Sequence, residues 1–152
     1  MNNKLYSFTA PEGRYYIGDP CYAIKGDKGD DHWSKWLHNA GIDNDDCSLL
    51  SGTIDGKHTA YGFGTAHGDG CYTDKAGREY SVDAGLIGLV PVAYLEEYNI
   101  PIEKDWVFVT FDKPTFCYKM GGTLVFGSIE IETDFEEVEE YDEDEYYEED
   151  EE

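Results

Sequence analysis

The chain has 152 residues, which predicts one domain, and its 34 acidic and 11 basic residues give a formal net charge of −23. This charge disfavours direct binding to nucleic acid, because that affinity depends on Lys and Arg side chains that neutralise phosphates. Binding to an anionic membrane surface is disfavoured for the same reason. Aromatic residues make up 15% of the chain, which is enough large apolar surface for a packed core.

The start of the chain and its apolar runs indicate a cytoplasmic protein that is not attached to a membrane. Residues 1–7 lack the apolar stretch of about seven residues that a signal peptide needs. No segment approaches the roughly 20 apolar residues that span a bilayer. In the cytoplasm we expect the four cysteines to be reduced rather than paired in disulfides. These cysteines are Cys21, Cys47, Cys71 and Cys117.

In the first half of the chain, short runs of alternating apolar and polar residues predict strands, and Gly, Pro and Asp mark the turns between them. The strands are expected at 4–9, 14–17, 49–54 and 59–64. Asp55-Gly56 separates the last two runs, and this dipeptide is a strong hairpin signal.

A helix is predicted between the second and third of these strands. Apolar residues recur there at i, i+3, i+4 and i+7, which forms one stripe along a helix. They are Trp33, Trp36, Leu37 and Ala40. Asp30 or Asp31 would cap the first amides, and Gly41 would end the helix. His32 and His38 lie near the two ends of this helix and are expected on its exposed side.

In the second half, strands are expected at 78–82, 86–90, 106–111, 115–118 and 123–131, and Gly121-Gly122 connects the last two. A second short helix follows Pro91, with Tyr94, Leu95 and Tyr98 facing inward, and ends at Pro101. The sum is a mainly β (α+β) fold, either a small twisted antiparallel sheet or a partly open barrel, with two short helices. We expect residues 1–132 to form this domain and residues 133–152 to form a disordered acidic tail that contains aromatic residues.

One short motif occurs twice. Gly-Asp-Pro-Cys-Tyr at 18–22, the first turn, returns as Gly-Asp-Gly-Cys-Tyr at 68–72, the second turn, with four of five residues identical. Gly-Asp-Pro and Gly-Asp-Gly are typical of turns in which Asp accepts hydrogen bonds from nearby backbone amides. Cys and Tyr would then begin the next element, since a small buried Cys behaves as a hydrophobe. This interpretation is favoured.

Three functional interpretations of the two turns remain open. One is a metal site formed by Cys21, His67, Asp69 and Cys71, although no Cys-x-x-Cys spacing is present. A second is a nucleophilic cysteine, with a histidine as base and Asp83 to orient it. Its candidates are Cys71 or Cys21 as nucleophile and His67 or His58 as base. The third is a ligand pocket for a nucleotide-like molecule, formed by the glycine-rich turns and tyrosines. A phosphate would require Arg14, Lys57 or Arg78 to converge on it.

The two turns and one further segment resemble a known family. Tyr-Tyr-Ile-Gly-Asp-Pro-Cys-Tyr at 15–22, Gly-Thr-Ala-His-Gly-Asp-Gly-Cys-Tyr at 64–72 and Val-Asp-Ala-Gly-Leu-Ile-Gly-Leu-Val-Pro at 82–91 are similar to a family of small uncharacterised proteins found mainly in bacteriophage genomes. The resemblance implies a phage-encoded protein that acts inside a bacterium. It implies no activity for these residues, and the acidic tail is not part of the shared pattern.

The acidic tail is the part of the chain with the clearest functional signal. From Asp134 to the end, nineteen residues hold fourteen carboxylates and no Lys or Arg. Such a run repels itself and attracts cationic surfaces. It could be a simple solubiliser, but its interleaved aromatic residues are not needed for that role. An extended chain advances about 3.3 Å per residue, and one DNA strand presents a phosphate about every 3.4 Å.

The sequence therefore predicts a binding protein rather than an enzyme, with no cofactor and no metal. It is expected to be a phage-encoded inhibitor of a basic, nucleic-acid-handling host protein, such as a restriction or other defence component, and to act by nucleic-acid mimicry. The residues expected to bind this partner are Glu136, Glu137, Glu139, Glu140, Tyr141, Asp142, Glu143, Asp144, Glu145, Tyr146 and Tyr147. The alternative is a small-molecule binder or Cys/His-dependent enzyme centred on Asp19, Cys21, His67, Asp69, Cys71 and Asp83.

Overall fold

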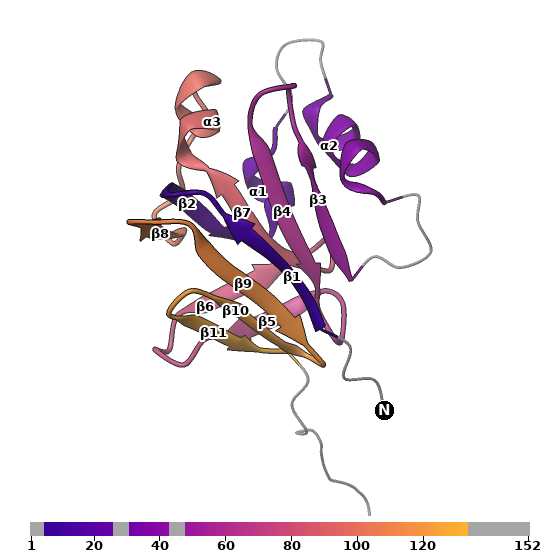
Figure 1. Cartoon of the computed structure of the whole chain (residues 1–152), viewed down its shortest axis with the longest axis vertical. Helices are drawn as coiled ribbons and strands as arrows, with labels where there is room; N and C mark the ends of the chain where they lie inside the picture. Colours follow the sequence, from indigo (N-terminus) through magenta and orange to yellow (C-terminus); the bar gives the residue numbers. More distant parts are fainter. Residues whose placement is uncertain (1–4, 26–30, 43–47, 134–152) are drawn as a thin grey trace, which may run out of the picture.

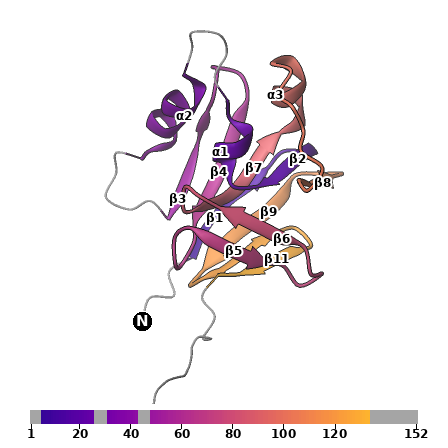
Figure 2. The same ribbon diagram turned by 180° about the vertical axis from the view of Figure 1, so that it is seen from behind.

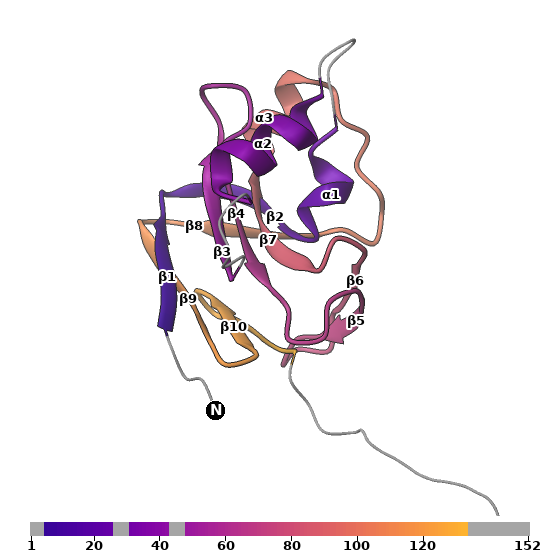
Figure 3. The same ribbon diagram turned by 90° about the vertical axis from the view of Figure 1, so that its right-hand side faces the viewer.

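Three layers make up the fold in the computed structural model, which describes residues 5–25, 31–42 and 48–133. Helices form the first layer and cover one face of a five-stranded sheet (Figure 1). The other face of that sheet packs against a four-stranded sheet and a separate hairpin, which is seen most clearly from the side (Figure 3). Seen from behind, the separate hairpin lies beside the last strand of the four-stranded sheet (Figure 2).

The strands pair in antiparallel fashion in all three sheets. The five-stranded sheet has the order β3-β4-β7-β2-β8, with β2 (Gly13–Gly18), β3 (Leu49–Thr53), β4 (Thr59–Gly64), β7 (Leu86–Pro91) and β8 (Val107–Phe111). The four-stranded sheet has the order β1-β9-β10-β11, with β1 (Leu5–Ala10), β9 (Thr115–Met120), β10 (Thr123–Phe126) and β11 (Ile129–Glu132). The separate hairpin pairs β5 (Gly70–Thr73) with β6 (Glu79–Val82). The predicted mainly β fold is confirmed, and within the described residues the sheets do not close into a barrel.

Two of the three helices in the described ranges were predicted. Helix α2 (His32–Ala40) begins where Asp31 accepts a hydrogen bond from the Ser34 amide, and it ends at Gly41 with a φ of 102°. Helix α3 (Val92–Glu97) follows Pro91, as expected. Helix α1 (Pro20–Ala23) was missed, because a single turn of four residues has no detectable period. None of the helices in the described part of the chain has the length and apolar content that crossing a membrane requires.

Two apolar clusters hold the layers together. The inner cluster fills the space between the two sheets and the β5–β6 hairpin, and Phe63, Leu89 and Phe126 are fully buried in it. The outer cluster lies under the helices, around Trp36. Close contact between β4 and β7 depends on glycine, because a Cβ on Gly88 would lie 1.7 Å from the Tyr61 carbonyl oxygen.

Two strand predictions were wrong. The single strand expected at 123–131 is the β10–β11 hairpin, which reverses at Gly127-Ser128, where Gly127 has a φ of 66°. Strand β5 was missed, because Gly70 and a buried Tyr72 among exposed neighbours give little apolar pattern. The Asp55-Gly56 hairpin is confirmed by the β3–β4 pairing, in which Thr53 lies opposite Thr59.

Candidate functional site

The first turn is built around a buried carboxylate. Asp19 has no exposed surface, and its Oδ1 accepts a hydrogen bond of 2.9 Å from the Cys21 amide, which caps α1. Its Oδ2 accepts bonds of 2.7 Å from the amides of Asp83 and Ala84. The carboxylate therefore ties the β2–α1 turn to the turn that precedes β7, sixty-four residues later in the chain. In the first turn, this arrangement confirms the expectation that Asp accepts a hydrogen bond from a nearby backbone amide.

The second turn has the same residues but a different setting. Asp69 and Cys71 are exposed, while Tyr72 is buried and its hydroxyl donates a hydrogen bond of 3.0 Å to the Gly68 carbonyl. A Cβ on Gly85 would lie 3.7 Å from the Gly68 Cα, so the second turn packs against the same 83–85 turn that Asp19 holds. The three segments that carry the family resemblance are thus neighbours in space.

The proposed metal ligands do not gather at this place. Within the described residues, the group of His, Cys, Asp and Glu side chains close enough to share one metal ion is Asp55, His58 and Glu97. Asp55 and His58 lie at the tip of the β3–β4 hairpin and Glu97 at the end of α3, and the group contains no cysteine. The four expected ligands, Cys21, His67, Asp69 and Cys71, form no such group among these residues.

The Asp55 group is already satisfied by contacts within the chain. Asp55 Oδ1 accepts from the amides of Lys57 and His58. Its Oδ2 accepts from His58 Nδ1 at 2.7 Å and from the Tyr98 hydroxyl at 2.9 Å. Lys57 Nζ lies 2.7 Å from Glu97 Oε2. Burial raises the pKa of Asp55, but these hydrogen bonds outweigh burial and hold its pKa well below the ordinary value. The group therefore holds the tip of the β3–β4 hairpin against the end of α3.

A nucleophilic cysteine is also not supported by the geometry. Burial and the neighbouring Asp19 carboxylate raise the pKa of the Cys21 thiol to about 12, so it stays protonated at neutral pH. His58, one of the two expected bases, is bonded to Asp55 instead. Asp83, the expected orienting residue, accepts a hydrogen bond of 2.5 Å from the Tyr22 hydroxyl. Cys21, Cys71 and Cys117 form no disulfide.

The expectation for His32 was wrong. Its side chain is 2% exposed, and its Nδ1 lies 2.9 Å from the Tyr94 hydroxyl. That hydroxyl donates its proton to the Lys25 carbonyl at 2.8 Å, so its oxygen accepts from Nδ1–H of His32. His32 lies four residues before the buried Trp36 and therefore shares its helix face, a signal that the sequence contained. His38 is exposed, as expected.

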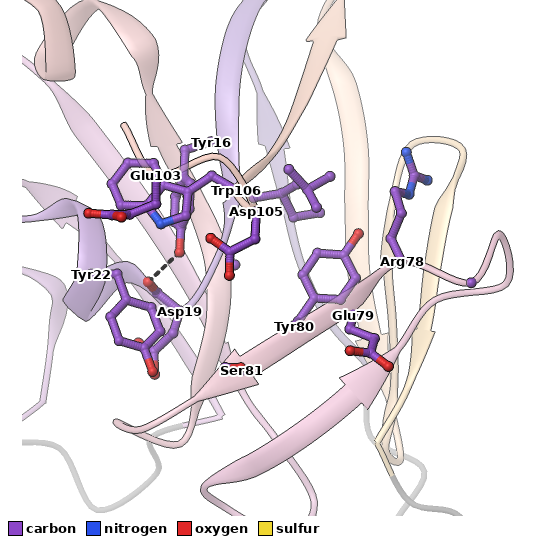
Figure 4. A pocket seen from close by; sticks show the side chains of 14 residues that line it. Tyr16, Asp19, Tyr22, Arg78, Glu79, Tyr80, Ser81, Glu103, Asp105 and Trp106 are labelled. Carbon is purple, nitrogen blue, oxygen red and sulfur yellow. Dashed lines mark hydrogen bonds between the residues drawn. The ribbon is translucent and has the colours of Figure 1, made fainter. Parts of the chain in front are cut away.

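A cleft of about 630 Å³ lies beside the first turn (Figure 4). One wall comes from the end of β2 and the start of α1, the second from β6 and the residues before it, and the third from the segment that leads into β8. Side chains that line it include Tyr16, Asp19, Tyr22, Arg78, Glu79, Tyr80, Ser81, Glu103, Asp105 and Trp106. Of the six residues expected to form the alternative site, Asp19 lines the cleft and the other five do not, whereas Arg78, named as a possible phosphate-binding residue, also lines it. The sequence analysis did not group the residues of the other two walls into a site, because they come from segments far apart in the chain.

The three tyrosines of the cleft have fixed hydroxyl groups. Each donates to an acceptor in the wall: Tyr16 to the Asp19 carbonyl (2.9 Å), Tyr22 to Asp83 Oδ2 (2.5 Å) and Tyr80 to Asp74 Oδ2 (2.7 Å). The hydrogen bond to Asp83, together with burial, raises the pKa of Tyr22. Burial and Asp74 raise the pKa of Tyr80 in the same way. These phenols stay neutral and keep their rings in place.

The charged groups of the cleft are mostly acidic. Among the described residues, Asp19, Glu79, Glu103 and Asp105 are its acidic lining residues and Arg78 is its basic one. Arg78 donates from Nε to Asp74 Oδ2 at 2.8 Å. The other two cations named from the sequence lie elsewhere, because Arg14 stacks over the Phe108 ring and Lys57 pairs with Glu97. The cations that a phosphate group requires therefore do not converge on this cleft.

The residues expected to bind a partner through the acidic tail, 136–147, lie outside the described residues. Comparison with known proteins also gives no assignment: no family model, no curated protein and no solved structure matches this chain. Function is therefore inferred from the charge of the chain and from the cleft.

Proposed function

We propose that this is a phage-encoded acidic protein that binds a basic, nucleic-acid-handling protein of the bacterial host and inhibits it by mimicking a nucleic acid. It acts in the host cytoplasm, without catalysis. The observation that carries the proposal is the acidic tail, which has fourteen carboxylates and no Lys or Arg in nineteen residues. The remaining 133 residues have 20 acidic and 11 basic side chains, so they add to the attraction for a cationic partner.

Electrostatics explains why such a segment competes with a nucleic acid. A groove that binds single strands combines cationic side chains for the backbone with aromatic or apolar surfaces for the bases. The tail offers carboxylates at a comparable spacing, together with Tyr141, Tyr146 and Tyr147 as rings. Association would be steered by long-range attraction and would weaken with added salt.

The environments of Cys21 and Cys117 support binding rather than catalysis by these two thiols. Burial and Asp19 raise the pKa of Cys21 to about 12, and burial raises the pKa of Cys117 to about 12. A thiol reacts as a nucleophile through its thiolate, so neither side chain is activated at neutral pH.

A pull-down from bacterial lysate tests the proposal. Three baits are compared at low and moderate salt: the full chain, residues 1–133, and a full-length variant in which the acidic residues between 136 and 145 become Gln or Asn. We expect one nucleic-acid-handling protein to be retained by the full chain alone at moderate salt. The purified partner should then lose its nucleic acid when the full chain is added.

Two controls separate mimicry from simple attraction. A full-length variant with Tyr141, Tyr146 and Tyr147 changed to Ser keeps every charge but removes the rings, and we expect it to compete less well than the natural chain. Equal retention of the partner by all three baits would contradict a role for the tail and place recognition on the folded domain.

A further inference from the structure

Besides the buried Asp19, three exposed carboxylates line the cleft beside the first turn, and among the described residues they have no counter-ion. Glu79 belongs to β6, and Glu103 and Asp105 belong to the segment before β8. All three are exposed, and none forms an ion pair within the described part of the chain. Asp105 projects toward the middle of the cleft, whereas the guanidinium of Arg78 is directed away from it (Figure 4). Lys104 lies between the two acidic residues in the chain but does not line the cleft.

Aromatic rings surround these carboxylates. Trp106 is half-buried and packs against Tyr16, with 4.6 Å between the ring centroids. Tyr22 lines the same space and is half-buried, whereas Tyr16 and Tyr80 are each 3% exposed and support the wall from behind. Because the hydroxyls of all three tyrosines are bonded to the wall, the rings are held in place and make no demand on a ligand for hydrogen bonds. Trp106 and Tyr22 are therefore the rings that a ligand can reach. Aromatic faces next to carboxylates attract cations by two independent effects, the ring quadrupole and the full negative charge.

The chemistry of the cleft disfavours anions, neutral apolar ligands and quaternary ammonium groups. An anion would be repelled by three carboxylates. A neutral apolar ligand would take water from these carboxylates and give them no partner. A quaternary ammonium would satisfy the rings but has no N–H group to donate to the carboxylates. A guanidinium does both, since it stacks on aromatic rings and donates to carboxylates in pairs. A primary ammonium does so less well, because it lacks the planar face.

We propose that this cleft binds a guanidinium or alkylammonium group, with guanidinium preferred. Its volume of about 630 Å³ holds such a group together with the chain that carries it. The group could belong to a free small molecule or to an arginine side chain on a protein. The inference does not rest on the acidic tail, because every residue that carries it lies between 16 and 107.

The test uses the full-length ¹⁵N-labelled protein and two matched pentapeptides, Gly-Gly-Arg-Gly-Gly and the same peptide with citrulline in place of arginine. Citrulline has the shape of arginine but no charge. The indole N–H signal of Trp106, assigned with a Trp106→Phe variant, reports on the cleft. The indole of Trp36, which donates to the Ala60 carbonyl inside the core, is the internal control. We expect saturable shifts of the Trp106 signal with the arginine peptide and at least tenfold weaker binding of the citrulline peptide.

A charge-matched pair of variants separates the cleft from general attraction to an acidic protein. Glu103→Gln with Asp105→Asn removes two charges from the cleft. Asp69→Asn with Asp112→Asn removes two exposed charges that do not line it. The first pair should lower the affinity for the arginine peptide at least tenfold. The second pair should leave that affinity within about twofold of the natural protein's, since screened charges outside the site contribute little. The proposal is overturned if the Trp106 signal does not move, if the citrulline peptide binds equally, or if both pairs have the same effect.

A third ligand identifies the source of the group. Agmatine carries a guanidinium and an ammonium but no peptide backbone. Binding of agmatine as tight as that of the peptide assigns the cleft to a free small cation, and tighter binding of the peptide assigns it to an arginine on a protein surface. Because purified protein and defined ligands are used, this result is independent of whether the tail retains a partner from lysate.

Discussion

The two Gly-Asp-x-Cys-Tyr turns differ at one residue in five, and that residue separates an interior turn from a surface turn. Pro20 fits the first position of a helix, so α1 starts there and its first amides point at Asp19. Gly70 has a φ of 150°, which proline cannot adopt, and it starts β5 instead. The carboxylate of Asp69 then has no helix to cap and remains exposed. Identical side chains thus acquire different roles from the element that follows them.

The largest difference between the turns is expected in the contribution of their aspartates to the free energy of unfolding. Asp19→Ala would leave three amides without their acceptor in the interior and should lower the free energy of unfolding by about 3–5 kcal/mol. Asp69→Ala should change it by less than about 0.5 kcal/mol, because its side chain is exposed. Urea titrations of both variants measure this comparison. Similar losses at the two positions would show that the second turn is not the surface turn described above.

The proline of the first turn can be introduced at the matching position of the second turn, Gly70. Gly70→Pro forces a φ near −65° where the backbone has 150°, so we expect a loss of about 2–3 kcal/mol and a disrupted β5–β6 hairpin. Gly77→Ala, also at a positive φ but in the turn of the same hairpin, is the milder control. Amide exchange of β5 and β6 measures the effect. Unchanged protection in Gly70→Pro would contradict the role assigned to this glycine.

Beyond the second turn, a different carboxylate supplies the stabilising charge. Asp74 accepts hydrogen bonds from Ala76, Arg78 and Tyr80. Burial raises its pKa, but those bonds prevail and hold the pKa below the ordinary value of 3.8. Because the folded-state pKa is the lower one, this stabilisation is present above about pH 4 and is lost as the pH falls further. Asp74→Asn should cost about 1–3 kcal/mol at pH 7 and flatten the acid limb of a stability–pH curve. An unaltered acid limb would contradict this account.

The cysteines of the two turns should differ in reactivity rather than in stability. Cys21 is half-buried with a pKa raised to about 12, whereas Cys71 is exposed. We expect iodoacetamide to modify Cys71 at least tenfold faster at pH 8, as measured by peptide mass spectrometry. The rate at Cys21 should still be rising at pH 10, because its thiol is mostly protonated there. Equal rates at the two positions would mean that burial and Asp19 do not protect Cys21.

The sequence predicted those parts of the fold that local patterns determine. The stripe of Trp33 and Trp36, with Asp31 before it and Gly41 after it, predicted α2 with its caps, and Asp55-Gly56 predicted a hairpin. Helix α1 and strand β5 could not be predicted, because four residues carry no period and their structure depends on distant contacts.

The cleft was beyond prediction for a related reason. Its walls come from residues near 20, 80 and 105, and only the fold brings them together. The first turn was recognised as a motif, but its buried acceptor binds amides that follow it by more than sixty residues. The interior position of His32, by contrast, could have been inferred from its spacing to Trp36.

Thr133 has a consequence for how this protein would be pulled apart. Its amide and its hydroxyl both donate to the Gly122 carbonyl, at 2.8 and 2.6 Å, its hydroxyl oxygen accepts from the Ala66 amide at 3.0 Å, and it has no exposed surface. An unfolding motor that pulls on the C-terminal end must first break these three hydrogen bonds of Thr133. Strand β11 comes next. Its hydrogen bonds to β10 would break one after another from the Glu132 end, and on its other side the Lys75 amide donates to the Glu130 carbonyl at 3.1 Å and would also have to separate. Resistance to such a motor would thus begin at Thr133 and continue at the contacts of Asp74 and Lys75 with β11, and loss of both would expose Ile129 and Ile131 from the core.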